Sequence, residues 1–103
     1  PIMFQKQVYD LMRRLPDGLI TTYGDIAVFA GSPRAALIVG GIAHRGDDSL
    51  PWHRLVNREG GLAIGFPGGR EVQRQLLEQE GIACDDSYHV VQFSELRWRP
   101  DSH

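Results

Sequence analysis

The sequence predicts a single small domain of the α/β class, mainly α, with a helix-turn-helix and a short β-hairpin. Length is the first observation, because 103 residues can bury one modest core without a second lobe. The second is the helical spacing of apolar residues in several segments, two of which are short and joined by a Gly-Ser turn. The third is a pair of short apolar runs, 55–56 and 62–64, on either side of a glycine-rich turn. Together they predict a winged-helix-like domain over residues 1–103.

The first predicted helix covers residues 4–15. Its apolar residues share one face at helical spacing, and its charged residues fall elsewhere on the wheel. That apolar face consists of Phe4, Val8, Leu11, Met12 and Leu15. The turn-forming residues 16–18 then end the helix, and residues 19–21 are long enough only for a short extended connector.

Two short helices follow and form the predicted helix-turn-helix. Thr22 is the expected N-cap of the first, with Asp25 as the acid at the third following position, a variant of the capping box. Gly31 ends that helix. Ser32 and Pro33 predict the N-cap and first turn of the second helix, which continues to about residue 44. Paired helices of this kind occur in DNA-binding proteins and also in bundles that never meet DNA.

Small residues on the second helix of this pair favour the DNA-binding interpretation. Ala35 and Ala36 stand at its front, where they would let the backbone approach a groove closely; the alternative is that they pack against the neighbouring helix. Gly40 and Gly41 lie inside the same helix. Because glycine costs a helix on the order of 1 kcal/mol relative to alanine, something is expected to approach closely there.

The second half of the chain predicts a hairpin, a glycine-rich loop and one more helix. Residues 55–56 and 62–64 are the expected hairpin strands. The loop 65–69 has three glycines around Phe66 and suits a flexible lip over a pocket, or only a connector. A helix is predicted from Arg70 to Glu80, with Gly81 as its stop. The remaining residues are expected to supply a strand and a last turn that close the core.

Composition and charge narrow the class of protein. A hydrophobic fraction of 42% with 23% charged residues is ordinary for a soluble globule, and no apolar run approaches the roughly 18 residues of a membrane span. The net charge of −2 is uneven, at +2 over residues 1–75 and −4 over residues 76–103, which fits phosphate contacts by the first part or an ordinary solvated surface. No secretion signal is visible, and one cysteine allows no internal disulfide. We therefore expect a cytoplasmic monomer, nucleoid-associated if prokaryotic, with no membrane partner.

Four ordered motifs carry a family resemblance over about residues 4–99. Residues 21–27, 31–36, 39–41 and 51–57 together resemble the DNA-binding domain of O6-alkylguanine-DNA alkyltransferases. The active enzymes have Pro-Cys-His-Arg where this chain has Pro51, Trp52, His53 and Arg54. A tryptophan at the cysteine position is similar to the alkyltransferase-like proteins. The resemblance implies a protein that binds O6-alkylguanine in DNA without repairing it.

The same resemblance implies that the chain is not an enzyme and has no catalytic residue. In the enzymes a thiolate, activated through a histidine and a glutamate, takes the alkyl group, and an indole is a far poorer nucleophile. His53 and Glu80 match the activating pair but have no thiol to activate. Cys84 is a poor substitute, since the adjacent carboxylates of Asp85 and Asp86 would raise the pKa of its thiol. No cofactor is implied, and the four histidines lack metal-ligand spacing.

The binding site is implied in the same way. The helix-turn-helix would enter the minor groove, and Tyr23 would help to rotate the damaged nucleotide outward. The flipped base would lie among Tyr23, Trp52 and the loop around Phe66, with Arg58 as a possible polar reader. The expected lesion-binding residues are Tyr23, Pro51, Trp52, Arg58 and Phe66. The expected DNA-binding residues are Thr22, Tyr23, Arg34, Ala35, Ala36 and Leu37.

Leu37 departs from the family pattern. The family has an arginine at this position, three residues after Arg34, which fills the gap left by the flipped base. An apolar wedge can still intercalate, but the hydrogen bond to the orphaned partner base would be lost. Weaker lesion binding than in relatives with arginine is expected, unless a shift of register brings Arg34 into the stack.

Three functional hypotheses remain open at the level of sequence. The first is a damage sensor that binds double-stranded DNA containing O6-alkylguanine and, by family analogy, passes it to nucleotide-excision repair proteins. The second is an alkyltransferase that uses another residue. The third is a winged-helix transcription regulator with ordinary sequence specificity.

Overall fold

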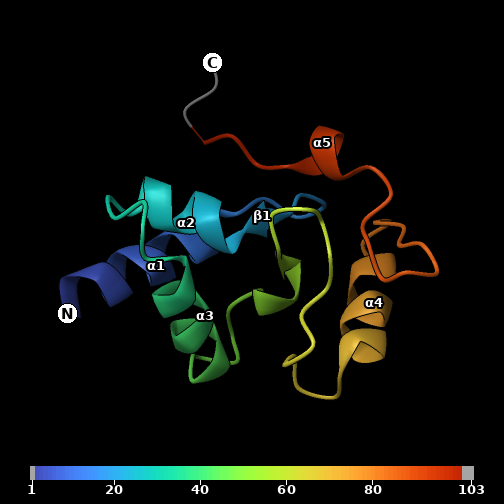
Figure 1. Ribbon diagram of the computed structural model, residues 1–103, viewed down its shortest axis with the longest axis horizontal. Coiled ribbons are helices and arrows are strands. Elements are labelled where there is room, and N and C mark those ends of the chain that lie inside the picture. The colour runs from blue at the N-terminus through green and yellow to red at the C-terminus, as the bar shows by residue number, and fades with distance from the viewer. Residues whose placement is uncertain (1, 101–103) are drawn as a thin grey trace.

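The computed structural model describes residues 2–100, which form five α-helices, one 3₁₀ helix and a two-stranded sheet (Figure 1). The α-helices are α1 (Ile2–Arg14), α2 (Tyr23–Phe29), α3 (Ala36–His44), α4 (Arg70–Glu78) and α5 (Phe93–Leu96). The 3₁₀ helix is η1 (Trp52–Arg54), and the strands are β1 (Thr21–Thr22) and β2 (Leu55–Val56). The α/β, mainly α, class is confirmed.

Helix α1 forms as its sequence pattern predicts. It begins two residues before the predicted start and ends one residue earlier, at Arg14. All five residues of the predicted apolar face are buried. The helix therefore packs by that face against α2 and α3, which is the arrangement that amphipathic spacing favours.

The predicted helix-turn-helix is present as α2 and α3, which pack against each other. Thr22 caps α2, because its Oγ1 accepts a hydrogen bond from the Asp25 amide at 3.0 Å. The Asp25 carboxylate is held by Arg97, whose Nε and Nη2 donate to it at 2.6 and 2.7 Å. Gly31, with φ +88°, turns the chain out of α2, and this left-handed conformation is one that glycine adopts readily.

The predicted start of α3 is wrong. Residues 32–35 form a turn closed by the Ala35 amide, which donates to the Ser32 carbonyl at 2.9 Å, and α3 begins at Ala36 without a side-chain cap. Ser32 is therefore not its N-cap, and Pro33 lies outside the helix. Ala35 and Val39 are both buried in the core, so tertiary packing sets where the helix begins.

The predicted hairpin is also wrong. β2 pairs with β1, in parallel, with Thr21 opposite Leu55 and Thr22 opposite Val56. After β2, the Asn57 side chain accepts hydrogen bonds from the amides of Glu59 and Gly61, each at 2.8 Å, which closes a tight turn. The chain is thereby redirected, and the Leu62 amide donates to the Tyr88 carbonyl at 2.9 Å instead of facing β2.

The C-terminal segment makes isolated bridges and the short helix α5. Residues 84 and 90 pair antiparallel, as do residues 61 and 89. Residues 20 and 97 pair in parallel, supported by hydrogen bonds from the Ile20 amide to the Leu96 carbonyl at 2.9 Å and from the Trp98 amide to the Ile20 carbonyl at 2.8 Å. The expected strand is thus a set of single bridges that fasten this segment across the domain.

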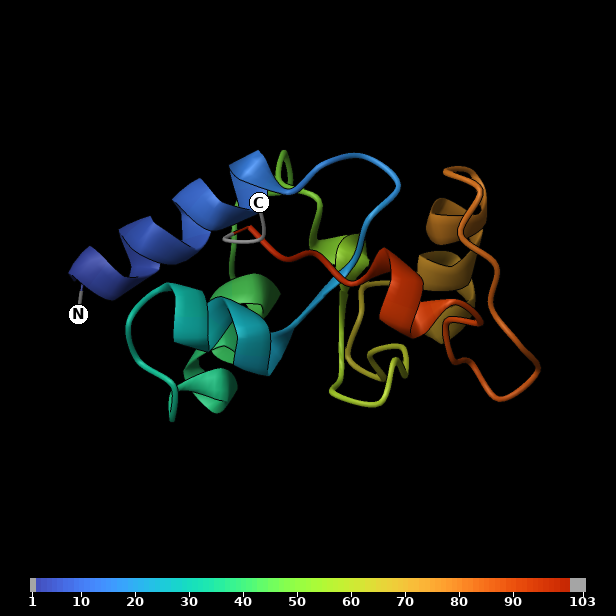
Figure 2. The same ribbon diagram turned by 90° about the horizontal axis from the view of Figure 1, so that it is seen from above.

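Buried apolar residues form two clusters. In Figure 2, α1, α2 and α3 lie on one side of the strand pair and α4 lies on the other. The helical cluster is the core between α1, α2 and α3, and it includes Trp98. The α4 cluster consists of Ile20, Val56, Leu62, Leu77, Ile82, Cys84 and Val90. Over residues 2–100, none of the helices has the length and apolar character that crossing a bilayer requires.

Candidate functional site

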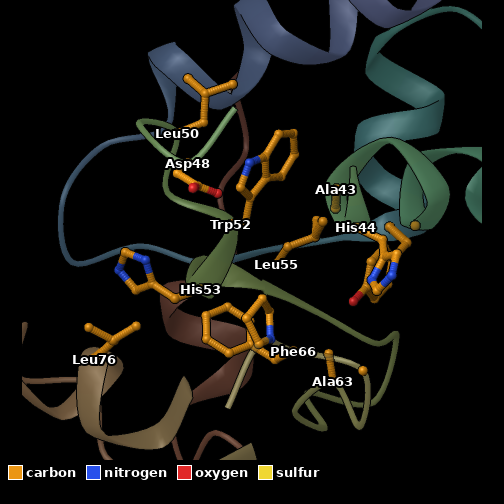
Figure 3. A pocket seen from close by; sticks show the side chains of 14 residues that line it. Ala43, His44, Asp48, Leu50, Trp52, His53, Leu55, Ala63, Phe66 and Leu76 are labelled. Atoms are coloured by element: carbon orange, nitrogen blue, oxygen red, sulfur yellow. The ribbon is translucent and has the colours of Figure 1, made fainter. Parts of the chain in front are cut away.

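A cavity of about 440 Å³ borders the helical cluster and is lined by residues from both halves of the domain. Helices α2 and α3, the segment 48–55, the loop 63–67 and α4 all contribute to its lining. Trp52 and Leu50 lie on the side toward α1, and Phe66 and Ala63 lie on the opposite side (Figure 3). The lining residues are Tyr23, Gly40, Ala43, His44, Asp48, Leu50, Trp52, His53, Leu55, Ala63, Gly65, Phe66, Pro67 and Leu76. The space is large enough for a drug-sized ligand and is walled mainly by apolar and aromatic groups.

Trp52 forms one wall of this cavity. It is the first residue of η1, and its indole Nε1 donates to the Asp47 carbonyl at 2.8 Å. The ring of Tyr9, on α1, meets the indole edge to face, with the centroids 5.9 Å apart and the planes at 64°. Such aromatic pairs stabilise a defined orientation. The indole is therefore held from outside the cavity and offers its remaining surface to whatever enters.

Tyr23 and Phe66 complete the aromatic part of the lining. Tyr23 is the first residue of α2, and burial raises the pKa of its phenol, so the group stays neutral and can donate a hydrogen bond. A Cβ at Gly40 would lie 3.8 Å from the Tyr23 ring, and one at Gly41 would lie 3.4 Å from the Arg45 guanidinium. Both are tolerable contacts, so packing within the described chain does not by itself explain the two helical glycines.

Arg54, Glu80 and His53 form a partly buried polar network behind η1. The Arg54 guanidinium is buried; its Nε donates to the Glu80 carboxylate at 2.9 Å, and its Nη2 donates to Asp17 at 2.8 Å. His53 Nε2 lies 2.5 Å from Glu80 Oε2, and the Gly18 amide donates to Glu80 Oε1 at 3.0 Å. Burial favours a higher pKa for Glu80, but these hydrogen bonds outweigh burial and the pKa of the carboxyl is lowered. Glu80 is thus an ionised anchor.

Cys84 lies apart from this site. It is buried in the α4 cluster and does not line the cavity. Burial raises the pKa of its thiol most; Glu78 raises the pKa further, Arg74 lowers it, and Asp85 has the smallest effect, which also raises it. The expected raised pKa is confirmed, although burial is its main cause and Asp86 takes no part. Among residues 2–100, no group of His, Cys, Asp and Glu is arranged to hold a metal ion.

The structure brings together only part of the predicted lesion site. Tyr23, Trp52 and Phe66 line the cavity, as the sequence suggests. Pro51 is half-buried at the N-cap of η1, and Arg58 is exposed in the turn after β2; neither lines the cavity. The role of Arg58 as a polar reader of the lesion stays a prediction.

The predicted DNA-binding residues also divide into two groups. Arg34 and Leu37 are exposed, Leu37 with 92% of its surface accessible. Ala36 is half-buried, whereas Thr22 and Ala35 are buried, Thr22 as the cap of α2 and Ala35 in the helical cluster. The side chain of Ala35 therefore packs within the protein, which was the alternative considered for this residue. Only its main chain can face a ligand.

Several lining residues were missed from the sequence. Asp48, Leu50 and His44 come from the end of α3 and the loop after it, and Leu76 comes from α4. Asp48 and Leu50 lie just before the segment 51–54 in the sequence, and this position could have indicated them. Leu76 has no such signal, because its approach to the cavity depends on how α4 packs against η1.

A helix-turn-helix packed beside an aromatic-lined cavity is the arrangement expected for the DNA-binding domain of O6-alkylguanine-DNA alkyltransferases and their relatives. The chain belongs to the family described as "6-O-methylguanine DNA methyltransferase, DNA binding domain", whose family model matches residues 3–82. The resemblance that the four motifs predict is therefore confirmed.

The chain is also similar to individual members of this family. It is 41% identical over 97 residues to the DNA base-flipping protein of Escherichia coli (strain K12), covering 92% of this chain and 74% of that protein. It is 31% identical over 103 residues to Alkyltransferase-like protein 1 of Schizosaccharomyces pombe, covering 94% of this chain and 95% of that protein. The crystal structure of S. pombe Atl1 in complex with damaged DNA containing O6-carboxymethylguanine superimposes with a TM-score of 0.87 at 29% identity, covering 97% and 98% of the two chains.

Proposed function

We propose that this protein is a non-enzymatic sensor of O6-alkylguanine in DNA. It would bind the duplex through the minor groove, rotate the damaged nucleotide into the cavity beside Trp52, and mark the site for nucleotide-excision repair. The observation that carries the proposal is the position of Trp52. Its indole forms a cavity wall in the segment where the related enzymes have their reactive cysteine.

The chemistry of the cavity supports binding without alkyl transfer. An indole is a poor nucleophile, and its neighbour His53 is hydrogen-bonded to Glu80, away from any thiol. The buried Cys84, whose pKa is raised, is poorly suited to form the thiolate that displacement needs. An extruded base would instead find aromatic surface on Tyr23, Trp52 and Phe66.

The outer surface of α3 supports an approach to DNA. Arg34 is exposed just before the helix, and Leu37 and Ile38 are exposed in its first turn. Arg34 can contact a phosphate, and an apolar side chain can occupy the space of an extruded base. The S. pombe relative was solved with damaged DNA, so an equivalent complex of this chain is geometrically reasonable.

Recognition of the bound lesion by repair proteins would depend on distortion of the duplex. Extrusion of a base and bending of the DNA cost a few kcal/mol, which binding must supply. A protein that binds the lesion without repairing it would keep the duplex distorted, and excision repair proteins could then recognise the distortion.

A competition titration tests the proposal. At one fixed salt concentration, the protein is titrated with matched duplexes that differ only in one O6-methylguanine. We expect at least a tenfold preference for the modified duplex, about 1.4 kcal/mol. Equal affinity for both, together with a strong preference between sequences, would indicate a regulator and contradict the sensor.

A second assay separates the sensor from an enzyme. Duplexes labelled on the alkyl group are incubated with the protein, which is then denatured and examined for covalent label. We expect none on the protein and intact O6-alkylguanine in the recovered DNA. Label on any residue would establish alkyl transfer and contradict the proposal.

A further inference from the structure

We propose that Tyr9 and Gly46 fix the position of the Trp52 indole and thereby set the largest O6-alkyl group that the cavity accepts. This inference rests on the proposed lesion-binding function and adds the residues that determine its specificity. Neither Tyr9 nor Gly46 lines the cavity, yet both contact the indole. They therefore act from behind the wall.

Gly46 provides a close approach that no other residue allows. A Cβ at this position would lie 2.6 Å from Cζ2 of Trp52 and 2.8 Å from the Ile42 carbonyl oxygen. Real Cβ atoms do not come this close, so a larger residue must displace the indole or the end of α3. The absence of a side chain at Gly46 thus leaves room for the Cε2 and Cζ2 atoms of the indole beside the end of α3.

Tyr9 holds the indole from the side of α1. The ring of Tyr9 meets it edge to face at 5.9 Å, and the Tyr9 hydroxyl accepts a hydrogen bond from Gln5 Nε2 at 3.2 Å. The Arg13 guanidinium lies 6.0 Å from the centre of the Tyr9 ring. These contacts give Tyr9 a defined orientation. The helix α1 thereby influences the cavity without contributing any lining residue.

The third contact fixes rotation about the side-chain bonds of Trp52. Nε1 donates to the Asp47 carbonyl at 2.8 Å, and Asp47 belongs to the loop that begins at Gly46. An indole that is contacted by Gly46 and Tyr9 and hydrogen-bonded to the Asp47 carbonyl cannot retreat when a bulky alkyl group enters. A small alkyl group leaves the indole in place, whereas an alkyl group larger than the remaining space must displace the indole, which reduces the binding free energy.

The test compares O6-methylguanine with O6-benzylguanine in otherwise identical duplexes, for the wild type and three variants. In Gly46→Ala the added methyl group pushes the indole into the cavity. We expect the ratio of benzyl to methyl affinity to fall by about tenfold. In Tyr9→Ala the indole loses its support and can move outward, so the same ratio should rise about fivefold. Tyr9→Phe keeps the ring and should retain the wild-type ratio.

Fluorescence provides a readout that does not depend on DNA. Trp98→Phe leaves Trp52 as the only tryptophan of the two in the chain. In this background, Tyr9→Ala should increase quenching of Trp52 by acrylamide, because the indole becomes more mobile and accessible, whereas Tyr9→Phe should not.

The outcomes distinguish the two levels of the proposal. If the wild type shows no preference for either modified duplex over the unmodified one, the lesion-binding function fails. If the wild type binds both lesions but Tyr9→Ala changes the two affinities equally, the role of Tyr9 is only structural and this inference is overturned. Should Gly46→Ala not fold, the pair Tyr9→Ala and Tyr9→Phe still decides the matter.

Discussion

Leu37 is the most exposed of the large apolar side chains in the described part of the chain. It lies in the first turn of α3, beside the half-exposed Ile38 and three residues after the exposed Arg34. A leucine here can fill the space left by an extruded base but cannot donate a hydrogen bond to the base that remains. We therefore expect a lower affinity for the lesion than an arginine at the same position would give.

The variant Leu37→Arg tests this consequence. We expect it to bind the O6-methylguanine duplex about tenfold more tightly, since a hydrogen-bonding pair with a base is worth about 1–3 kcal/mol. Fluorescence anisotropy with labelled duplexes at fixed salt measures the change. Ile38→Arg is the matched control, because it adds the same charge one residue away. It should strengthen binding to the modified and the unmodified duplex by the same factor. Unchanged or weaker binding by Leu37→Arg contradicts the role assigned to Leu37.

Individual site residues were predictable where a local motif names them. Trp52 and Tyr23 lie in recognisable motifs, and Phe66 lies in a glycine-rich loop, so their convergence on one cavity follows from the sequence. Tyr9 gave no signal. Its contact with Trp52 joins residues 43 positions apart, and such contacts depend on how α1 packs. The side chain of Thr22 caps α2 and is buried, so the contact with DNA expected of this residue stays a prediction.

At the scale of elements, hydrogen bonds from Arg54 join η1 to Leu15, directly after α1, and to Glu80, two residues beyond α4. Arg54 donates to Glu80 and also, at 3.3 Å, to the Leu15 carbonyl at the end of α1. Removing one partner of a buried pair leaves the other with an unmet desolvation cost. The element that positions Trp52 is therefore stabilised electrostatically from behind.

The variant Glu80→Gln tests this arrangement through pH. The pKa of Glu80 is lower in the folded protein than its ordinary value of 4.5, so its contribution is fully present above about pH 4.5 and is lost as the pH falls toward the folded pKa. We expect Glu80→Gln to reduce the free energy of unfolding by about 2 kcal/mol at pH 7. The difference from wild type should shrink in acid, as measured by urea denaturation across pH.

Glu78→Gln is the control for this experiment, because Glu78 pairs with Arg74 on an exposed face of α4 at 3.2 Å. Exposed pairs of this spacing contribute about 0.3–0.5 kcal/mol. A loss in Glu80→Gln that is no larger than in Glu78→Gln, or that persists unchanged in acid, would show that the pair contributes little.

The elements that local chemistry specifies were predicted well. The apolar spacing of α1 and the Thr22 cap of α2 depend on residues within a few positions. Helix α4 begins at Arg70 as predicted but ends at Glu78, two residues before the predicted end at Glu80. The start of α3 and the pairing of β2 were predicted wrongly. The burial of Ala35 and the parallel register with β1 arise from contacts between residues distant in sequence. An apolar pair such as 55–56 does not specify its partner.

At the scale of the whole molecule, Trp98 closes the domain. It is buried against Phe29, with ring centroids 6.1 Å apart, and the Arg14 guanidinium lies 5.7 Å from its ring. Its amide bonds to Ile20, which belongs to the other cluster. The C-terminal segment thus fastens the helical cluster to the α4 cluster.

The variant Trp98→Ala should lower the free energy of unfolding by about 3–5 kcal/mol, the usual cost of deleting a buried tryptophan. Urea denaturation followed by far-UV circular dichroism measures the loss. Arg99→Ala, at an exposed neighbouring position, should change stability by less than about 0.5 kcal/mol. A loss below 1 kcal/mol in Trp98→Ala would mean that the segment is not an essential part of the core.

The parallel pair of β1 and β2 has a consequence for how such a protein can diverge. Tyr23 directly follows β1, and Trp52 lies three residues before β2. The relative position of these two aromatic walls of the cavity therefore depends on the pairing register of the two short strands. Insertion of a single residue in either strand would slide one wall past the other by about 3.3 Å, the rise per residue of a strand. We therefore expect length changes in either strand to be poorly tolerated, so that new ligand ranges arise by substitution around a fixed spacing.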